Sequence, residues 1–213
     1  MIKIKNLTVE KNNIKILDDL NLTLSKNEKI LISGKSGTGK TTLLKTILFY
    51  DVKTAGKIYF YDEEISKKNI NEFRNKVTYI GQKPPAFNGN VNEFLSIPYD
   101  FKSNNKNAPS EVVINNLLIK LSFDVKVLEK NFNSLSGGEQ QRITIIQSLL
   151  LNKNIFLLDE ITSSLDKENI RNVVNLFRRE EKTLLVVSHN SEWENLADKI
   201  YLMKNGKLIL AGN

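Results

Sequence analysis

Hydrophobic and polar residues alternate over the N-terminal part of the chain and predict β-strands there. Ile2 and Ile4 alternate with lysines, and leucines occupy every second position over 20–24. This period of two is typical of a strand with one buried face. The apolar run over 29–33 predicts a fully buried strand, which leads through a glycine-rich loop into a helix expected over 40–49.

The middle of the chain has a different pattern, which predicts a helical segment. Strands are still expected over 56–61 and 77–80, with a short helix over 70–75 between them. From 83 to 134 no strong strand pattern occurs, and 102–110 is expected to be a polar loop. The residues that fit one apolar helical face are Val112, Val113, Leu117, Leu118 and Leu121. This face belongs either to the core of a small inserted subdomain or to a partner-binding site.

Strands and helices alternate over the last third of the chain. Strands are expected over 154–159, 183–188, 199–204 and 207–210, and helices over 166–179 and 191–197. Strands separated by helices favour a parallel sheet that is covered by helices on both faces. We therefore predict an α/β fold that carries an inserted helical subdomain.

The loop after the strand over 29–33 matches the phosphate-binding pattern G-x-x-x-x-G-K-[ST] in full. The matching residues are Gly34, Lys35, Ser36, Gly37, Thr38, Gly39, Lys40 and Thr41. In such a loop, backbone N–H groups and the N-terminus of the next helix point at phosphate oxygens. Lys40 can then reach the β- and γ-phosphates, and the Thr41 hydroxyl can ligate Mg²⁺.

A pair of acidic residues follows the apolar strand expected over 154–159. This strand would carry Asp159 to its carboxyl end, where open α/β sheets bind ligands. We expect Asp159 to hold Mg²⁺ through water. Glu160 would sit closer to an attacking water molecule and act as its general base.

Composition and charge exclude several classes of site. The chain has no cysteine and one histidine, so disulfides, thiol catalysis and multi-histidine metal sites are excluded. Its net charge of +7 comes from 26 Lys and only 5 Arg against 24 acidic residues. Nucleic-acid readers favour arginine, so we attribute this charge to a lysine-rich coding bias and expect no nucleic-acid partner. The longest apolar runs have about four residues and the N-terminus lacks a secretory stretch, so a cytoplasmic location is expected.

The segment Leu135-Ser-Gly-Gly-Glu-Gln-Gln-Arg142 matches L-S-G-G-[QE], and on it the chain resembles the ATP-binding cassette (ABC) ATPases. Other motifs of that family follow in order. Gln82 matches the Q-loop glutamine, Ser163-Ser-Leu-Asp166 the D-loop, and His189 the switch histidine. The resemblance covers essentially the whole chain. It implies a P-loop NTPase core with a mainly parallel sheet, an N-terminal antiparallel β subdomain and an inserted α-helical subdomain.

The resemblance also implies a domain plan and the roles of particular residues. Residues 1–213 would form one ABC ATPase domain, with the core and β subdomain over 1–82 and 143–213 and the helical subdomain over about 83–142. The catalytic residues would be Glu160, His189, Gln82 and Lys40. The ATP-binding residues would be the loop residues from Gly34 to Thr41, then Thr42, Ser136, Gly137, Gly138, Glu139 and Asp166. The Mg²⁺ site would comprise Thr41, Gln82 and Asp159.

The signature segment begins a predicted helix, so it would form a second anion site. In the family, two cassettes pair head to tail, and the signature of one closes on the γ-phosphate held by the other. A stand-alone cassette of this kind resembles a transporter subunit that drives a separate membrane permease from the inner face of the membrane. The family's permease groove includes the segment 84–87 and the residues Val91, Phe94 and Leu95, which could equally be core.

The sequence leaves alternatives on three points: the cargo, the class of ATPase and the contacts to adenine. The segment from Leu158 and the Gln82 loop resemble a small bacterial subunit linked to iron export, although nothing in the chain identifies a cargo. The alternative is an ABC-type regulatory or assembly ATPase that acts on a soluble or nucleic-acid partner. The family also has an aromatic residue near position 11 that stacks on adenine, where this chain has Lys11. Packing from Ile14, Ile16 or the Lys11 stem would have to replace it, so relaxed base selectivity is expected.

Overall fold

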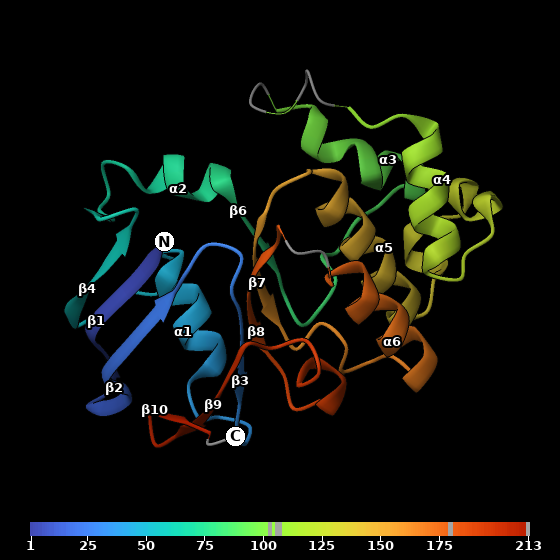
Figure 1. The fold of residues 1–213 in the computed structure, drawn as a ribbon. Coiled ribbons are helices and arrows are strands. Elements are labelled where there is room, and N and C mark those ends of the chain that lie inside the picture. Colours follow the sequence, from blue (N-terminus) through green and yellow to red (C-terminus); the bar gives the residue numbers. More distant parts are fainter. Residues whose placement is uncertain (102–103, 105–107, 179–180, 212–213) are drawn as a thin grey trace. The chain divides into compact units, whose positions relative to one another are not determined.

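The structure is a computed structural model of the chain and describes residues 1–101, 104, 108–178 and 181–211. The predicted polar loop over 102–110 therefore lies partly outside the described residues. The chain forms two compact units (Figure 1). Unit 1 comprises Met1–Tyr79, Asn154–Glu160 and Arg179–Asn213, and unit 2 comprises Ile80–Lys153 and Ile161–Arg178.

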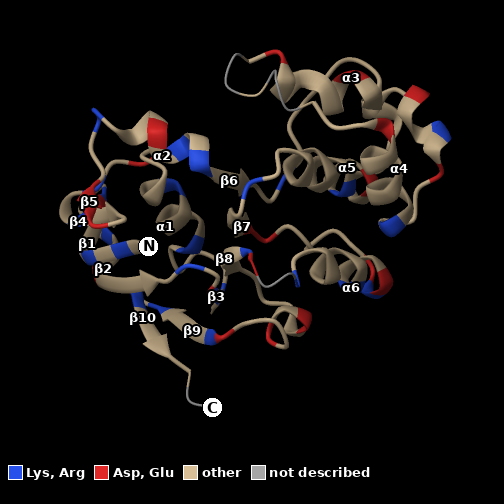
Figure 2. Cartoon of the chain, turned by 45° about the horizontal axis from the view of Figure 1, so that its top comes forward, with Lys and Arg blue, Asp and Glu red and all other residues tan. Residues whose placement is uncertain are grey.

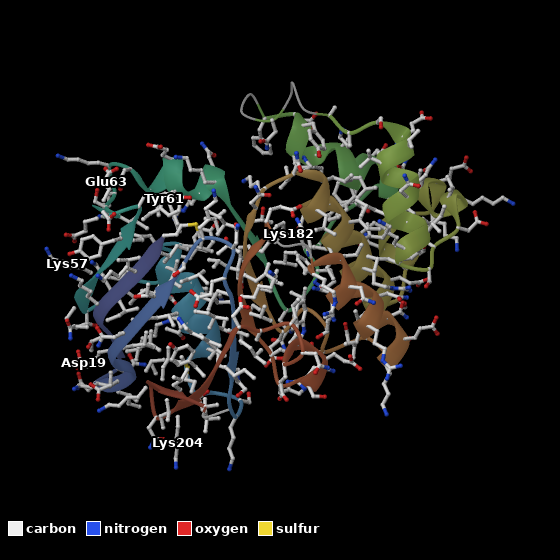
Figure 3. All side chains as sticks on the ribbon, viewed as in Figure 1. Asp19, Lys57, Tyr61, Glu63, Lys182 and Lys204 are labelled. Carbon is white, nitrogen blue, oxygen red and sulfur yellow. The ribbon has the colours of Figure 1, made fainter. Side chains whose placement is uncertain are left out.

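Unit 1 contains an antiparallel sheet built from the N-terminal strands. In sheet order, its strands are β2 (Ile14–Leu24), β1 (Ile2–Lys11), β4 (Ala55–Phe60) and β5 (Glu63–Glu64). The predicted N-terminal antiparallel subdomain is therefore confirmed. At the outer edge of this sheet, Lys57 of β4 pairs with Glu64 of β5 at 2.9 Å. Figure 3 shows Lys57, Tyr61 and Glu63 on the left of the view.

A second sheet is mainly parallel and carries the glycine-rich loop. In sheet order, its strands are β10 (Lys207–Leu210), β9 (Lys199–Lys204), β3 (Lys29–Ser33), β8 (Thr183–Val187), β7 (Ile155–Asp159) and β6 (Val77–Ile80). Strand β3 is parallel to β8 and β9, and β10 returns antiparallel to β9. Every residue of β7 and β8 is buried, which explains their continuous apolar sequences. The predicted α/β class with a mainly parallel sheet is confirmed.

Helix α1 (Lys40–Ile47) follows the glycine-rich loop and joins the core of unit 1. Its Leu43, Leu44 and Ile47 are fully buried in one hydrophobic cluster with residues of both sheets. Helix α2 (Ile70–Lys76) adds Phe73 to the same cluster. Because α1 is anchored on one face by three aliphatic side chains, its N-terminus is held in a fixed position at the end of β3.

Unit 2 is built from helices. They are α3 (Val91–Ser96), η1 (Ile97–Tyr99), α4 (Glu111–Lys120), η3 (Val125–Glu129), η4 (Phe132–Ser134), α5 (Gly137–Leu150) and α6 (Lys167–Leu176). Aromatic rings form part of its core, where Phe94 stacks on Phe132 with ring centroids 4.3 Å apart and Phe87 packs against both. Among the described residues, no helix of either unit combines the length and apolarity needed to cross a membrane.

Several expectations differ from the structure in detail. The helix expected over 191–197 is a 3-10 turn, η5 (Ser191–Trp193), because Trp193 turns into the core and is 1% exposed. Val91, Phe94 and Leu95 are also buried, so they form core rather than a groove.

The predicted apolar face of α4 is only partly buried. Leu118 and Leu121 are in the core, whereas Val112 and Val113 are exposed. The compact units also differ from the predicted subdomains, because the structure groups 143–153 and 161–178 with the helices of unit 2.

Candidate nucleotide-binding site

The glycine-rich loop connects β3 to α1 in unit 1, and Gly39 is its last residue before the helix. Gly39 has a φ of +104°, and a Cβ there would lie 2.8 Å from the Ile16 carbonyl oxygen and 2.9 Å from Leu17 Cδ2. Both the backbone conformation and the close approach of β2 therefore require glycine. Because Gly39 has no side chain, no capping side chain accepts hydrogen bonds from the first N–H groups of α1. These N–H groups can therefore donate to a bound anion such as phosphate.

Lys40 lies inside the curve of this loop and is 7% exposed. Its Nζ donates to the carbonyl oxygens of Gly34 at 2.7 Å and Lys35 at 3.0 Å. Glu160 Oε1 is 3.8 Å from the same Nζ. The ammonium group is thus held where phosphate oxygens would lie along the loop.

Thr41 and Asp159 converge on one position at the end of β7. The Thr41 hydroxyl donates to Asp159 Oδ1 at 3.0 Å, and Asp159 is 1% exposed. Both groups are oxygen donors, which Mg²⁺ prefers. The described residues contain no cluster of three or more His, Cys, Asp or Glu side chains that could hold a metal. The donor set therefore fits a cation that takes its remaining ligands from phosphate and water.

Glu160 follows β7 in an uncommon backbone conformation. Its φ is +51°, and its backbone N–H donates to the Val187 carbonyl at 2.8 Å. The carboxylate brings Oε2 to 2.9 Å from His189 Nδ1, at the end of β8. Left-handed non-glycine residues are strained and cluster at functional sites. The structure thus brings together Lys40, Glu160 and His189 in unit 1, as the sequence predicts.

The remaining predicted site residues lie either in the phosphate loop and α1 or in unit 2. Ser36, Gly37 and Thr38 complete the open part of the loop, and the Thr42 carbonyl accepts a bond from the Thr46 hydroxyl at 2.7 Å. Gln82, the signature residues and Asp166 belong to unit 2.

The signature residues begin helix α5 with a capping box. The Ser136 hydroxyl accepts from the backbone N–H of Glu139, and the Glu139 carboxylate accepts from the backbone N–H of Ser136 at 2.8 Å. The Ser136 hydroxyl also donates to that carboxylate at 2.8 Å, and the two bonds that Ser136 donates, the backbone bond first, hold the pKa of Glu139 below its usual range. Glu139 therefore stabilises the start of the helix that carries the signature.

The two signature glycines have different surroundings. A Cβ at Gly138 would lie 3.1 Å from the Ser164 carbonyl oxygen, so the D-loop backbone packs against this position. At Gly137, no described atom lies within 4 Å of the corresponding Cβ position, and the φ of Gly137 is not positive. Nothing in the described structure requires a glycine at 137.

Asp166 is the N-cap of α6, and it is linked to the signature helix. The backbone N–H of Asn169 donates to Asp166 at 2.9 Å and lowers the pKa of that carboxyl, with a further bond from the Asn169 side chain. The side-chain oxygen Oδ1 of Asn169 accepts from Arg142 at 2.7 Å, and Arg142 also donates to the backbone carbonyl of Leu121 at 2.7 Å. Sequence reasoning assigned no role to Arg142 or Asn169, although Arg142 ends the segment that contains the signature.

Gln141 is a second residue that the sequence did not single out. It is completely buried, and its Nε2 donates at 3.1 Å to the carbonyl of Gly81, the residue before Gln82. Gln82 itself is exposed. Helix α5 therefore contacts the Q-loop backbone through Gln141 and α6 through Arg142, which ties the signature, Q-loop and D-loop of unit 2 into one network.

Lys11 occupies the position where the family places an aromatic residue that stacks on adenine. The Lys11 ammonium pairs with Asp51 at 2.9 Å, so its charge is already partnered. Ile14 is 64% exposed at the β1–β2 hairpin, and Ile16 lies against Gly39 of the loop. Aliphatic side chains therefore lie on β2 next to the phosphate-binding loop.

Comparisons with known proteins agree with this geometry. A family model described as ABC transporter matches residues 17–163, which is more than half of the chain. The chain is 32% identical over 208 residues to the probable iron export ATP-binding protein FetA of Escherichia coli (strain K12), covering 96% of this chain and 91% of that protein. It is 34% identical over 215 residues to the energy-coupling factor transporter ATP-binding protein EcfA of Aster yellows witches'-broom phytoplasma (strain AYWB). That match covers 98% of this chain and 78% of EcfA.

A solved structure shows the same fold. It is a dimeric, post-hydrolysis state of the ATP-binding cassette MJ0796 bound to ADP and Pi, with a TM-score of 0.84 and 26% identity, covering 98% of this chain and 96% of that one. The phosphate loop, the acidic pair after β7 and the signature helix thus occur in a chain whose sequence and fold both match one family. The chain belongs to the ABC transporter family, as an ATP-hydrolysing, ATP-binding subunit.

Proposed function

We propose that this ATPase drives a separate membrane permease, and that two copies pair head to tail around two ATP molecules during each cycle. The observation that carries the catalytic part is the convergence of Lys40, Asp159 and Glu160 at the carboxyl ends of β3 and β7. A buried ammonium group, a metal-binding carboxylate and a second carboxylate beside them are the groups that hydrolysis of a γ-phosphate needs.

The residues have separate roles in this proposal. Lys40 exchanges its loop carbonyl partners for the β- and γ-phosphate oxygens. Thr41 and Asp159 would hold Mg²⁺, which when bound would neutralise negative charge on the phosphates. Glu160 accepts a proton from the attacking water, and His189, 2.9 Å away, orients that carboxylate and contacts the γ-phosphate.

The head-to-tail pair is supported by the glycine at 137. Neither packing nor backbone conformation in the described part of the chain explains the absence of a side chain there. A phosphate group held by a second copy would explain it, because the group must approach the N-terminus of α5 closely. Ser136 and Gly138 flank this position. The related cassette MJ0796 is dimeric in its post-hydrolysis structure.

A surface pocket on unit 1 is suited to a cytoplasmic segment of the permease. It has a volume of about 510 Å³, and its lining includes Phe49, Val52, Ile70, Lys67 and Arg74. Val52 is 86% exposed, so an apolar side chain already faces solvent there. An apolar helix with acidic flanks would complement this combination of apolar and cationic groups. Docked in this way, the chain would be peripheral on the inner face of the membrane.

The cargo proposal rests on a relative. FetA is described as a probable iron export protein, and its match spans nearly all of both chains, so we propose metal export with iron as the first cargo to test. The match to EcfA makes another cargo the competing outcome. Figure 2 shows basic and acidic residues interspersed along the elements of each unit, which does not favour the alternative of a nucleic-acid partner.

Two experiments test these proposals. With ATP and Mg²⁺, Glu160→Gln protein should dimerise in light scattering while the ADP-bound form stays monomeric; a monomer at saturating ATP would refute the head-to-tail pair. Co-expression with the permease should yield a complex whose ATPase is stimulated by that protein. Val52→Glu should abolish the stimulation and leave the basal ATPase unchanged. ATPase that responds to nucleic acid instead would support the alternative.

A further inference from the structure

Both carboxylate oxygens of Asp159 accept a hydrogen bond from the protein. Oδ1 accepts from the Thr41 hydroxyl at 3.0 Å, and Oδ2 accepts from the Tyr79 phenol at 3.1 Å. Asp159 is 1% exposed, so these donors largely replace water around its charge. Thr41 belongs to the phosphate-loop motif, whereas Tyr79 lies on β6 and belongs to no motif that the sequence identifies.

The ring of Tyr79 is held in place by packing. The side chain is half-buried and packs against the core cluster of unit 1. The packed ring therefore keeps the hydroxyl at 3.1 Å from Asp159 Oδ2.

The second hydrogen bond fixes the orientation of the carboxylate. The terminal torsion of an aspartate is broad, so a single bond from Thr41 would leave the plane of the group free to rotate. With donors on both oxygens, the lone pairs left over point in a defined direction. Groups that hold a metal ligand in this way contribute strongly to metal affinity.

We propose that Tyr79 is a positioning residue for the magnesium site, acting through Asp159. The proposal rests on the role in Mg²⁺ binding proposed above for Asp159 and Thr41. It assigns Tyr79 a function beyond filling the core, because its hydroxyl, and not only its ring, contributes to the site.

The experiment compares nucleotide affinity with and without the metal. Isothermal titration calorimetry measures the dissociation constant of the non-hydrolysable analogue AMP-PNP in Mg²⁺ and in EDTA. Tyr79→Phe retains the ring and removes only the hydroxyl. Its affinity in EDTA should match the wild type, while the factor by which Mg²⁺ tightens binding should fall about tenfold. Tyr59→Phe is the matched control, since Tyr59 is a half-buried tyrosine of β4 in the antiparallel sheet, and its factor should be unchanged.

Three outcomes are decisive. A wild-type Mg²⁺ factor in Tyr79→Phe would overturn the inference and leave the metal site intact. If the wild type itself gained nothing from Mg²⁺, the underlying metal proposal would fail instead. In an Asp159→Asn background, Tyr79→Phe should have no further effect on the factor; a persisting effect would mean that the hydroxyl does not act through Asp159.

Discussion

Substitutions at Glu160 can test separately its proposed role as general base and the strain of its left-handed backbone conformation. Glu160 has a φ of +51°, and its N–H is tied to the Val187 carbonyl at 2.8 Å. Glu160→Gln preserves the shape of the side chain and removes the base. Glu160→Ala removes the side chain and keeps a Cβ in the left-handed conformation, whereas Glu160→Gly removes both.

The expected stability difference between the alanine and glycine variants follows from these features. A left-handed residue with a Cβ costs about 1–2 kcal/mol. Glycine costs about 0.5–1 kcal/mol through the entropy of the unfolded chain. The contacts to Lys40 and His189 are lost equally in both variants and cancel. Glu160→Gly should therefore be more stable than Glu160→Ala by roughly 1 kcal/mol, the reverse of the usual order.

Urea unfolding without nucleotide measures this difference, and a coupled ATPase assay measures turnover. All three variants should lose about 10²–10⁴-fold in turnover, while Glu160→Gln still binds ATP. If Glu160→Ala proved more stable than Glu160→Gly, the strain argument would be wrong. Near-normal turnover of Glu160→Gln would remove Glu160 from the role of base.

Four further predictions follow from the site. Lys40→Ala should weaken ATP binding about 10–100-fold because a charged hydrogen-bond donor is lost. Lys45→Ala, at an exposed position of α1, should not; equal affinities of the two variants in calorimetry would contradict the role of Lys40. Mixing Ser136→Arg with Glu160→Gln protein should lower the ATP-induced dimer fraction in light scattering, and an unchanged fraction would count against a signature that acts on the partner's ATP. GTP should bind within about a hundredfold of ATP, because no aromatic residue occurs before Phe49 and base stacking is worth only about 1–3 kcal/mol. A larger preference for ATP in competition binding would contradict the idea that Ile14 and Ile16 replace the aromatic residue. The folded-state pKa of Glu139 is lowered, so its capping contribution should be present at neutral pH and be lost as the pH falls below the ordinary glutamate pKa of about 4.3. The difference in unfolding free energy between the wild type and Glu139→Gln should therefore close on acidification. A difference in urea unfolding that stays constant with pH would contradict this.

Much of the fold could be predicted because local pattern and burial agree in it. The alternation over 20–24 marks a strand with one buried face, and the apolar residues of β7 and β8 mark strands buried on both faces. The phosphate-loop residues are contiguous in sequence, so a pattern of spacing is enough to find them.

The parts that were missed depend on contacts between distant segments. Tyr79 reaches Asp159 across 80 positions of sequence, and Gln141 reaches Gly81 across 60. Neither contact leaves a local pattern. The helix expected over 191–197 failed for a related reason, since burial of Trp193 and the Asn190 cap, which accepts from Glu192 at 2.9 Å, favour a tight 3-10 turn.

Trp193 is the only tryptophan of the chain, and it lies in the turn that directly follows His189 and Asn190. Intrinsic emission excited at long wavelength therefore comes from one place in the molecule, a buried indole 1% exposed. A shift in that emission on addition of ATP reports movement of the switch-histidine segment without any label. The native protein thus contains its own optical probe for stopped-flow measurement of the catalytic cycle.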